Sequence, residues 1–210
     1  MDLTRASLLR EMLSGTELGN RTTEFGYALR RFTTRRSGLM LFGPVDEEPW
    51  HLTAHLDDEL RMAGVEDMRP SLVRWAPPPD APPHLAIGLD RLRDAGRGES
   101  LLVVAEDAPA DTLLERISDV RKRGTTIFSI GNGDKELTSL SHETLVPELL
   151  VPDGFGWTTR ELEPEAPTIA EGFETAQHLV SLAAADDEAG RSGWRRRLRN
   201  AIERLSGEPA

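Results

Sequence analysis

The segment from Leu101 to Ile130 constrains the fold more than any other part of the chain. An apolar run at 101–105 is followed by a polar turn and by four apolar residues at helical spacing, Leu113, Leu114, Ile117 and Val120. Gly124 is placed to end this helix, and a β-rich run follows at 125–130. Two parallel strands joined by a helix need a sheet that is covered on both faces. We therefore predict an α/β fold, a three-layer sandwich with a central, mostly parallel sheet and helices on both faces.

The remaining pattern divides the chain into three parts. We expect N-terminal helices in residues 1–36, which pack on the core or on a second subunit, the α/β domain in 37–187, and a basic amphipathic helix with a tail in 188–210. Inside the domain the pattern predicts a strand at 39–42, a helix at about 48–63, a proline-rich connector at 70–83, a helix at 84–95, an edge strand at 146–151 and a helix at about 168–185.

Charge and composition exclude several classes of protein. The net charge of −11 argues against a nucleic-acid partner, because binding to phosphates needs a cationic surface. The absence of cysteine excludes disulfides, thiolate nucleophiles and Cys-ligated zinc. No segment approaches the roughly 20 apolar residues of a membrane span, and no apolar signal core is present, so we expect a cytoplasmic protein.

Two predicted helices each carry a carboxylate and an imidazole four residues apart. His55 and Glu59 share one helical face, and Glu174 and His178 repeat the spacing in reverse order. Such pairs can act in acid–base catalysis or can bind a divalent metal such as zinc. Solvated ion pairs are the simpler interpretation of each pair alone. If the two helices face each other, His55, Glu59, Glu174 and His178 are candidate metal ligands; the alternative is that no cofactor is bound.

Three turns at predicted strand ends are candidate ligand loops, because ligands of open parallel sheets bind at the carboxyl ends of strands. They contain six candidate residues: Gly43, Asp46, Glu106, Asp107, Gly131 and Asn132. A turn with as few glycines as 131–134 is also typical of a plain connection.

The segment 193–205 has the pattern of a basic amphipathic helix. One face carries Trp194, Leu198, Ala201, Ile202 and Leu205, and arginines occupy the others. Such a helix can dock on the acidic body of this chain, on a second subunit or on another protein; membrane binding is the less favoured alternative.

The order of elements from Thr22 to Asp187 resembles the sugar isomerase (SIS) domain family, and its phosphoheptose isomerase branch in particular. The segment 52–60, LTAHLDDEL, is similar to the HFAxEL helix of that branch, and His178 falls on the histidine of its late helix. The resemblance implies acid–base roles for Glu59 and His178, and zinc binding by these two residues with His55 and a glutamine. The glutamine position is Ala170 here, so one ligand is missing unless Glu171 or Glu174 substitutes for it. It also implies a homo-oligomer, a dimer or a tetramer.

The ligand loops depart from this family pattern. The segment 105–110, AEDAPA, stands in the place of the STSGNS loop, so that Glu106 and Asp107 replace hydroxyl groups that would donate to phosphate. Like charges about 5 Å apart cost on the order of 3 kcal/mol at an effective dielectric near 20. We therefore expect a degenerate SIS protein that has lost phosphosugar binding and serves as a non-catalytic scaffold, regulator or sensor. The alternatives are a metal-dependent isomerase that uses Glu59 and His178, and a module that binds phosphosugars through backbone amides.

Overall fold

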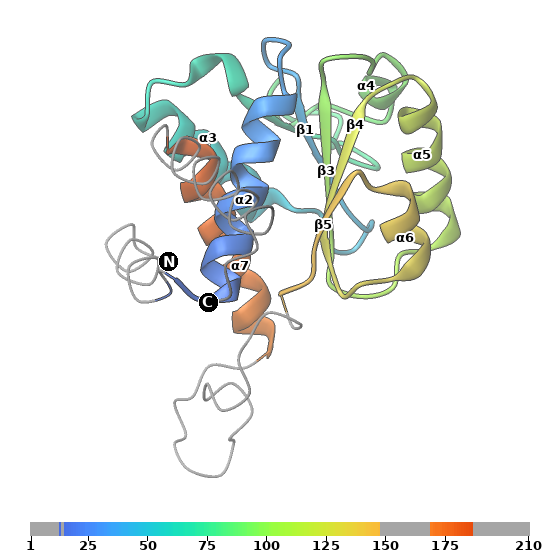
Figure 1. Cartoon of the computed structure of the whole chain (residues 1–210). Helices are drawn as coiled ribbons and strands as arrows, with labels where there is room; N and C mark the ends of the chain where they lie inside the picture. Colours follow the sequence, from blue (N-terminus) through green and yellow to red (C-terminus); the bar gives the residue numbers. More distant parts are fainter. Residues whose placement is uncertain (1–12, 14, 148–168, 187–210) are drawn as a thin grey trace.

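The computed structural model describes residues 13, 15–147 and 169–186, and it contains one five-stranded sheet (Figure 1). The strands lie in the order β2-β1-β3-β4-β5, and every neighbouring pair is parallel. Their bounds are Leu39–Phe42 for β1, Pro70–Leu72 for β2, Ser100–Ala105 for β3, Thr126–Gly131 for β4 and Glu143–Leu145 for β5. Leu41 of β1 pairs with Leu72 on one side and Leu102 on the other.

Helices cover both faces of the sheet. One face carries α2 (Glu17–Phe32), α3 (Trp50–Met62) and α7 (Ile169–Ala185), and the other carries α4 (Asp90–Arg93), α5 (Asp111–Lys122) and α6 (Lys135–Leu140) (Figure 1). A short 3-10 helix, η1, covers Glu66–Met68. Alternate strand residues enter two separate cores, so that Leu102 packs with the first group of helices and Val103 with the second. The predicted α/β/α sandwich is confirmed.

The first helix layer depends on a close approach between α2 and α7. A Cβ added at Gly26 of α2 would meet the Cβ of Ala183 at 2.7 Å and the backbone N of Ala184 at 2.8 Å. The absence of a side chain at Gly26 therefore brings the two helix backbones together. Phe25, beside it, is fully buried and contacts Phe128 of β4 edge to face, with 5.5 Å between the ring centroids.

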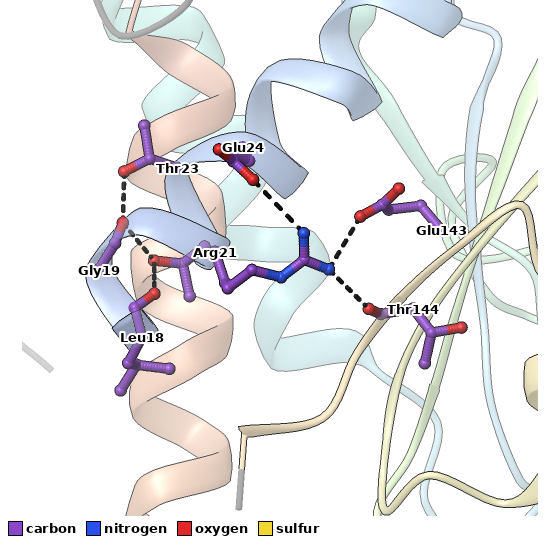
Figure 2. A network of polar contacts seen from close by, with 8 residues as sticks. Leu18, Gly19, Arg21, Thr23, Glu24, Glu143 and Thr144 are labelled. Atoms are coloured by element: carbon purple, nitrogen blue, oxygen red, sulfur yellow. Dashed lines mark hydrogen bonds and ion pairs between the residues drawn. The ribbon is translucent and has the colours of Figure 1, made fainter. Parts of the chain in front are cut away.

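Arg21 connects α2 to the edge strand β5 (Figure 2). Its guanidinium lies 3.0 Å from the carboxylate of Glu143 and donates a longer bond, 3.4 Å, to the backbone carbonyl of Thr144. A second nitrogen faces Glu24 on the next turn of α2 at 3.4 Å. The side chain thus holds the first helix of the described part against the last strand of the sheet.

The expected helix at 84–95 is wrong for most of its length, because only Asp90–Arg93 is helical. Residues before it are held extended: Gly88 forms an isolated parallel bridge with Arg74, whose backbone N–H donates to the Ile87 carbonyl at 2.9 Å. Leu85, which the helical pattern placed on an apolar face, is exposed. A turn in which the Leu85 N–H donates to the Pro82 carbonyl, and then the isolated bridge from Gly88 to Arg74, stand in place of the helix.

Two other boundaries also differ. The connector expected at 70–83 begins as a strand, β2, because its first residues pair with β1. The edge strand is Glu143–Leu145 rather than 146–151, and most of the expected range lies outside the described residues. The helices expected at the N-terminus before residue 13 and over 193–205 also lie outside them. No helix in the described ranges is both long and apolar enough to cross a membrane.

Candidate ligand crevice and histidine cluster

The strand order indicates that a ligand would bind beyond the ends of β1 and β3, in a region that we call the crevice. The chain passes from β1 to β2 on one side and returns to β3 on the other, so the order reverses between β1 and β3. Open parallel sheets bind ligands at the carboxyl ends of the strands at such a point. Gly43, directly after β1, permits close packing there, because a Cβ would lie 2.8 Å from the Val104 carbonyl of β3. Gly131 likewise ends β4 at a position where a Cβ would lie 2.8 Å from the Ala105 carbonyl.

The two loops that border this crevice bring four carboxylates together. Asp46 and Glu47 follow β1, and Glu106 and Asp107 follow β3. Partial burial raises the pKa of Glu47, and the negative charges of Glu106, Asp107 and Asp46 raise it further. Burial is the largest cause, and the three charge contributions show that these other carboxylates lie near Glu47. We call these four residues the acidic cluster.

The loop from Gly43 to Pro49 is held in place by Trp75, which follows β2. The indole N–H of Trp75 donates to the Gly43 carbonyl at 2.8 Å, and its ring packs on Phe42 with 5.1 Å between centroids. Glu48 accepts from the backbone N–H of Trp75 at 3.1 Å and from the Arg74 guanidinium at 2.7 Å. Trp75 thus packs against the core of the second helix layer, and Glu48 is held by Arg74 and by the Trp75 backbone.

The third candidate loop, residues 131–134, forms the N-terminal cap of α6. Asn132 accepts from the backbone N–H of Asp134 at 3.0 Å, and Asp134 caps α6 by accepting from Glu136 and Leu137. The side chains of Asn132 and Asp134 therefore form the start of a helix. This arrangement agrees with the plain-turn interpretation of residues 131–134.

Three histidines meet where α3 packs against α7. His51 and His55 lie on successive turns of α3, and His178 reaches them from α7. The ring centroids of His178 lie 4.3 Å from His55 and 5.4 Å from His51, both edge to face. One nitrogen from each ring lies within 4.8 Å of the others, and no other group of three potential metal ligands this close occurs in the described part of the chain. We call these three residues the histidine cluster.

Two histidines of the cluster are within hydrogen-bond distance of each other, and the third has a buried nitrogen without a hydrogen bond in the described part of the chain. The Nε2 atoms of His51 and His55 are 2.8 Å apart, within hydrogen-bond distance. The Nε2 atom of His178 is buried, and no described group forms a hydrogen bond with it. An unpaired buried polar atom costs free energy, so its presence calls for an explanation such as a ligand.

Burial favours the neutral form of two rings of the cluster, those of His55 and His178. Burial lowers the pKa of His178 to about 4, with further lowering by His55 and His51. Burial also lowers the pKa of His55, and His51 contributes to that change. Glu174 of α7 faces the group, with Oε1 3.4 Å from His51 Nδ1 and 3.9 Å from His178 Nε2. Neutral imidazoles are the form that binds metal ions.

Among the predicted site residues, the structure brings His55, His178 and Glu174 together and leaves Glu59 outside the histidine cluster. Glu59 lies one turn beyond His55 on α3, is almost fully buried, and has a pKa raised by burial and by Asp58. His51 was missed, although its spacing of four from His55 is the same signal that selected Glu59. The α7 helix contacts α3 at the first two turns, which puts His51 rather than Glu59 beside His178.

The donor set fits a divalent transition metal. Zinc prefers imidazole nitrogens at 2.0–2.1 Å, and three protein ligands with one open position are typical of catalytic zinc sites. The Nε2 of His178, which has no hydrogen-bond partner among the described residues, and the lowered pKa values of His178 and His55 agree with this chemistry. Glu174 is placed to accept from Nδ1 of His51, as carboxylates do behind metal-bound histidines.

No known protein-family model matches the sequence, and no curated protein matches it. Solved structures do match the fold. A sugar-binding protein of Salmonella typhimurium LT2 superposes with a TM-score of 0.50 at 14% identity over 91% of this chain. This chain spans about half of that protein, 51% of its length, and at such identity the likeness concerns the fold alone.

Two further structures match over nearly their whole length. One is the sugar isomerase domain of an RpiR transcription factor from Sphaerobacter thermophilus, with 12% identity, a TM-score of 0.47, and coverage of 84% of this chain and 86% of the other. The second is a Methanococcus jannaschii protein whose structure was taken to infer the function of a 3-hexulose-6-phosphate isomerase, with 10% identity, a TM-score of 0.49, and coverage of 90% and 93%.

Proposed function

We propose that this chain, which has the fold of the sugar isomerase (SIS) domain, has lost phosphosugar binding and serves as a non-catalytic sensor or regulator of a non-phosphorylated ligand. The observation that carries this proposal is the position of the acidic cluster, with Asp46 and Glu47 after β1 and Glu106 and Asp107 after the neighbouring strand β3. A phosphate site needs hydrogen-bond donors, backbone amides or cations. Four carboxylates around the crevice repel a phosphate dianion and favour a neutral or cationic ligand.

A thermal-shift comparison tests this proposal, because a ligand that binds the native state must raise the melting temperature. The wild type should show no shift with glucose 6-phosphate. The double variant E106S/D107S places hydroxyl groups in the loop after β3. It should bind glucose 6-phosphate more tightly than the wild type does and should therefore show a larger thermal shift. D80S/D94S removes the same charge at exposed positions outside the crevice loops and serves as the matched control. A clear stabilisation of the wild type by glucose 6-phosphate would contradict the proposal.

The histidine cluster favours a second candidate function, a metal-dependent enzyme that acts on a neutral or cationic sugar. His51, His55 and His178 would hold the metal, which when bound would supply a Lewis acid beside the crevice. The chain itself would position the site through Glu174 and hold a proton on Glu59, whose raised pKa keeps that carboxyl protonated to higher pH. In this case Glu59→Gln should abolish turnover and leave the fold intact.

Metal analysis separates the two candidates. Purified protein should bind zinc at one ion per chain in titration calorimetry, and H55A/H178A should lose that binding. The variant H84A, at an exposed histidine outside the cluster, is the control. If the wild type binds zinc no better than H55A/H178A, the metal-dependent candidate is excluded, whereas the proposal about the acidic crevice is unaffected.

A further inference from the structure

A groove runs along the outer surface between α5 and α6, on the face of the sheet opposite to α2 and α7. It has a volume of about 720 Å³, and Leu114 and Leu140 form its apolar floor. Its walls carry four carboxylates: Asp111, Glu115 and Asp119 on α5 and Glu136 on α6. This groove is separate from both the crevice and the histidine cluster.

The α5 carboxylates form a regular stripe. Asp111, Glu115 and Asp119 are spaced by four residues, so they project from the same side of the helix. Only Asp119 has a cationic partner in the described residues, Lys122 at 3.4 Å, and both side chains of that pair are exposed. The groove therefore offers unneutralised negative charge beside an apolar floor, which suits a helix with a cationic border and an apolar face.

One segment of this chain has that complementary pattern. Residues 191–205 contain six arginines and one glutamate, in a chain whose total charge is −11. The apolar residues Trp194, Leu198, Ala201, Ile202 and Leu205 fall on one side of a helix drawn over 193–205. Arg195 and Arg199, spaced by four, border that side, as Glu115 and Asp119 do in the groove.

The path of the chain favours a second copy as the source of this segment. The end of α7 lies against α2, where Arg30 donates to the Ala185 carbonyl at 3.3 Å. From Asp186 to residue 193 the chain can span at most about 25 Å. The groove lies beyond the sheet, so a path around the edge must pass a helix layer, the sheet and a second helix layer, each helix about 10 Å thick. Such a path is longer than the roughly 25 Å that residues 186–193 can span.

We propose that two copies of this chain exchange their C-terminal segments, each placing residues 193–205 in the α5–α6 groove of the other. The contact is then the same on both sides, as a two-fold symmetric dimer requires. Arg195 and Arg199 face Glu115 and Asp119, and the apolar side covers Leu114 and Leu140. Because two grooves are filled at once, the exchange doubles the buried surface of a single docked helix.

Light scattering on the full chain tests this proposal. The wild type should be a dimer. The groove variant E115R/D119R and the segment variant R195E/R199E should each raise the dissociation constant at least about tenfold, and their combination should restore the dimer. R196E reverses a charge on the side of the segment opposite to the apolar residues and should remain dimeric. Circular dichroism verifies that each variant is folded.

Two results would overturn the exchange. One is a dimer that neither reversal weakens, which would place the interface elsewhere. The other is a monomeric wild type, whether or not hydrogen exchange shows the segment protected on its own groove.

Discussion

His51 and His55 present their Nε2 atoms to each other at 2.8 Å across one turn of α3. One of the two nitrogens must donate and the other accept, so only one of the two Nε2 atoms carries the shared hydrogen. A metal ion would replace this bond with two coordination bonds, which makes His51 rather than Glu59 the third ligand beside His55 and His178.

The first prediction follows from that geometry. His51→Gln should weaken zinc binding at least about tenfold, because second-shell changes alone cost 10–100-fold at such sites. Glu59→Gln should change the affinity less than twofold, because its carboxyl lies outside the cluster. Titration calorimetry at neutral pH measures both. A larger loss for Glu59→Gln than for His51→Gln would contradict this assignment and would favour Glu59 as a ligand.

The metal-free protein should lose stability as the pH falls from 6.5 towards 4. Burial lowers the pKa of His178 to about 4 from the ordinary 6.5, so in this window the unfolded chain binds a proton that the native state does not. The free energy of unfolding therefore decreases as the pH falls and levels off below about 4. The loss due to His178 is at most about 3 kcal/mol.

Urea unfolding at pH 7 and pH 4.5 in a chelator measures that slope. His178→Gln should flatten it, while His84→Gln, at an exposed site, should leave it as in the wild type. Equal slopes for the wild type and His178→Gln would rule out the neutral buried imidazole.

The acidic cluster predicts a pH dependence of the opposite sign. The pKa of Glu47 is raised, so the native state binds its proton at a higher pH than the unfolded chain does. Between that raised value and 4.5, the contribution of Glu47 to the free energy of unfolding increases as the pH falls. Asp107→Asn should lower the Glu47 pKa, as followed by carbon NMR of the carboxyl, and should raise the melting temperature at neutral pH. Asp80→Asn should do neither.

Gly26→Ala should destabilise the fold by about 1–3 kcal/mol, because an added methyl would overlap Ala183 and force α2 away from α7. Gly96→Ala is the matched control, since its Cβ would meet only the Arg123 carbonyl, at 4.0 Å. Chemical denaturation of the two variants gives the comparison. If Gly26→Ala lowers the free energy of unfolding no more than Gly96→Ala does, the close packing of α2 on α7 does not contribute to stability.

Local sequence patterns predicted the sheet and the main helices where no long-range contact overrides the local pattern. The strand at 101–105 and the helix that follows it obey two clear periods, and the structure has them as β3 and α5. The helix at 84–95 failed because Leu85, Leu89 and Leu92 have helical spacing, although a backbone pairing with Arg74 holds the first part extended. Long-range pairing of this kind leaves no local signal.

The candidate site was predictable only in part for the same reason. The spacing of four selected His55 and the pair on α7, but it applied equally to His51 and Glu59. The choice between those two depends on where α7 crosses α3, which is a property of packing and not of either helix. The acidic loops, by contrast, could be placed from the sequence, because parallel strands bring their carboxyl ends to one edge.

The bond from Arg21 to β5 also has a consequence outside the native monomer. β5 is the last strand of the sheet, and an uncovered last strand is a template on which a strand from another molecule can add. A guanidinium at the Thr144 carbonyl occupies one of the groups that such an incoming strand would use. The helix that opens the described fold thus covers part of this edge, and heat that frees Arg21 would leave the Thr144 carbonyl open to an incoming strand.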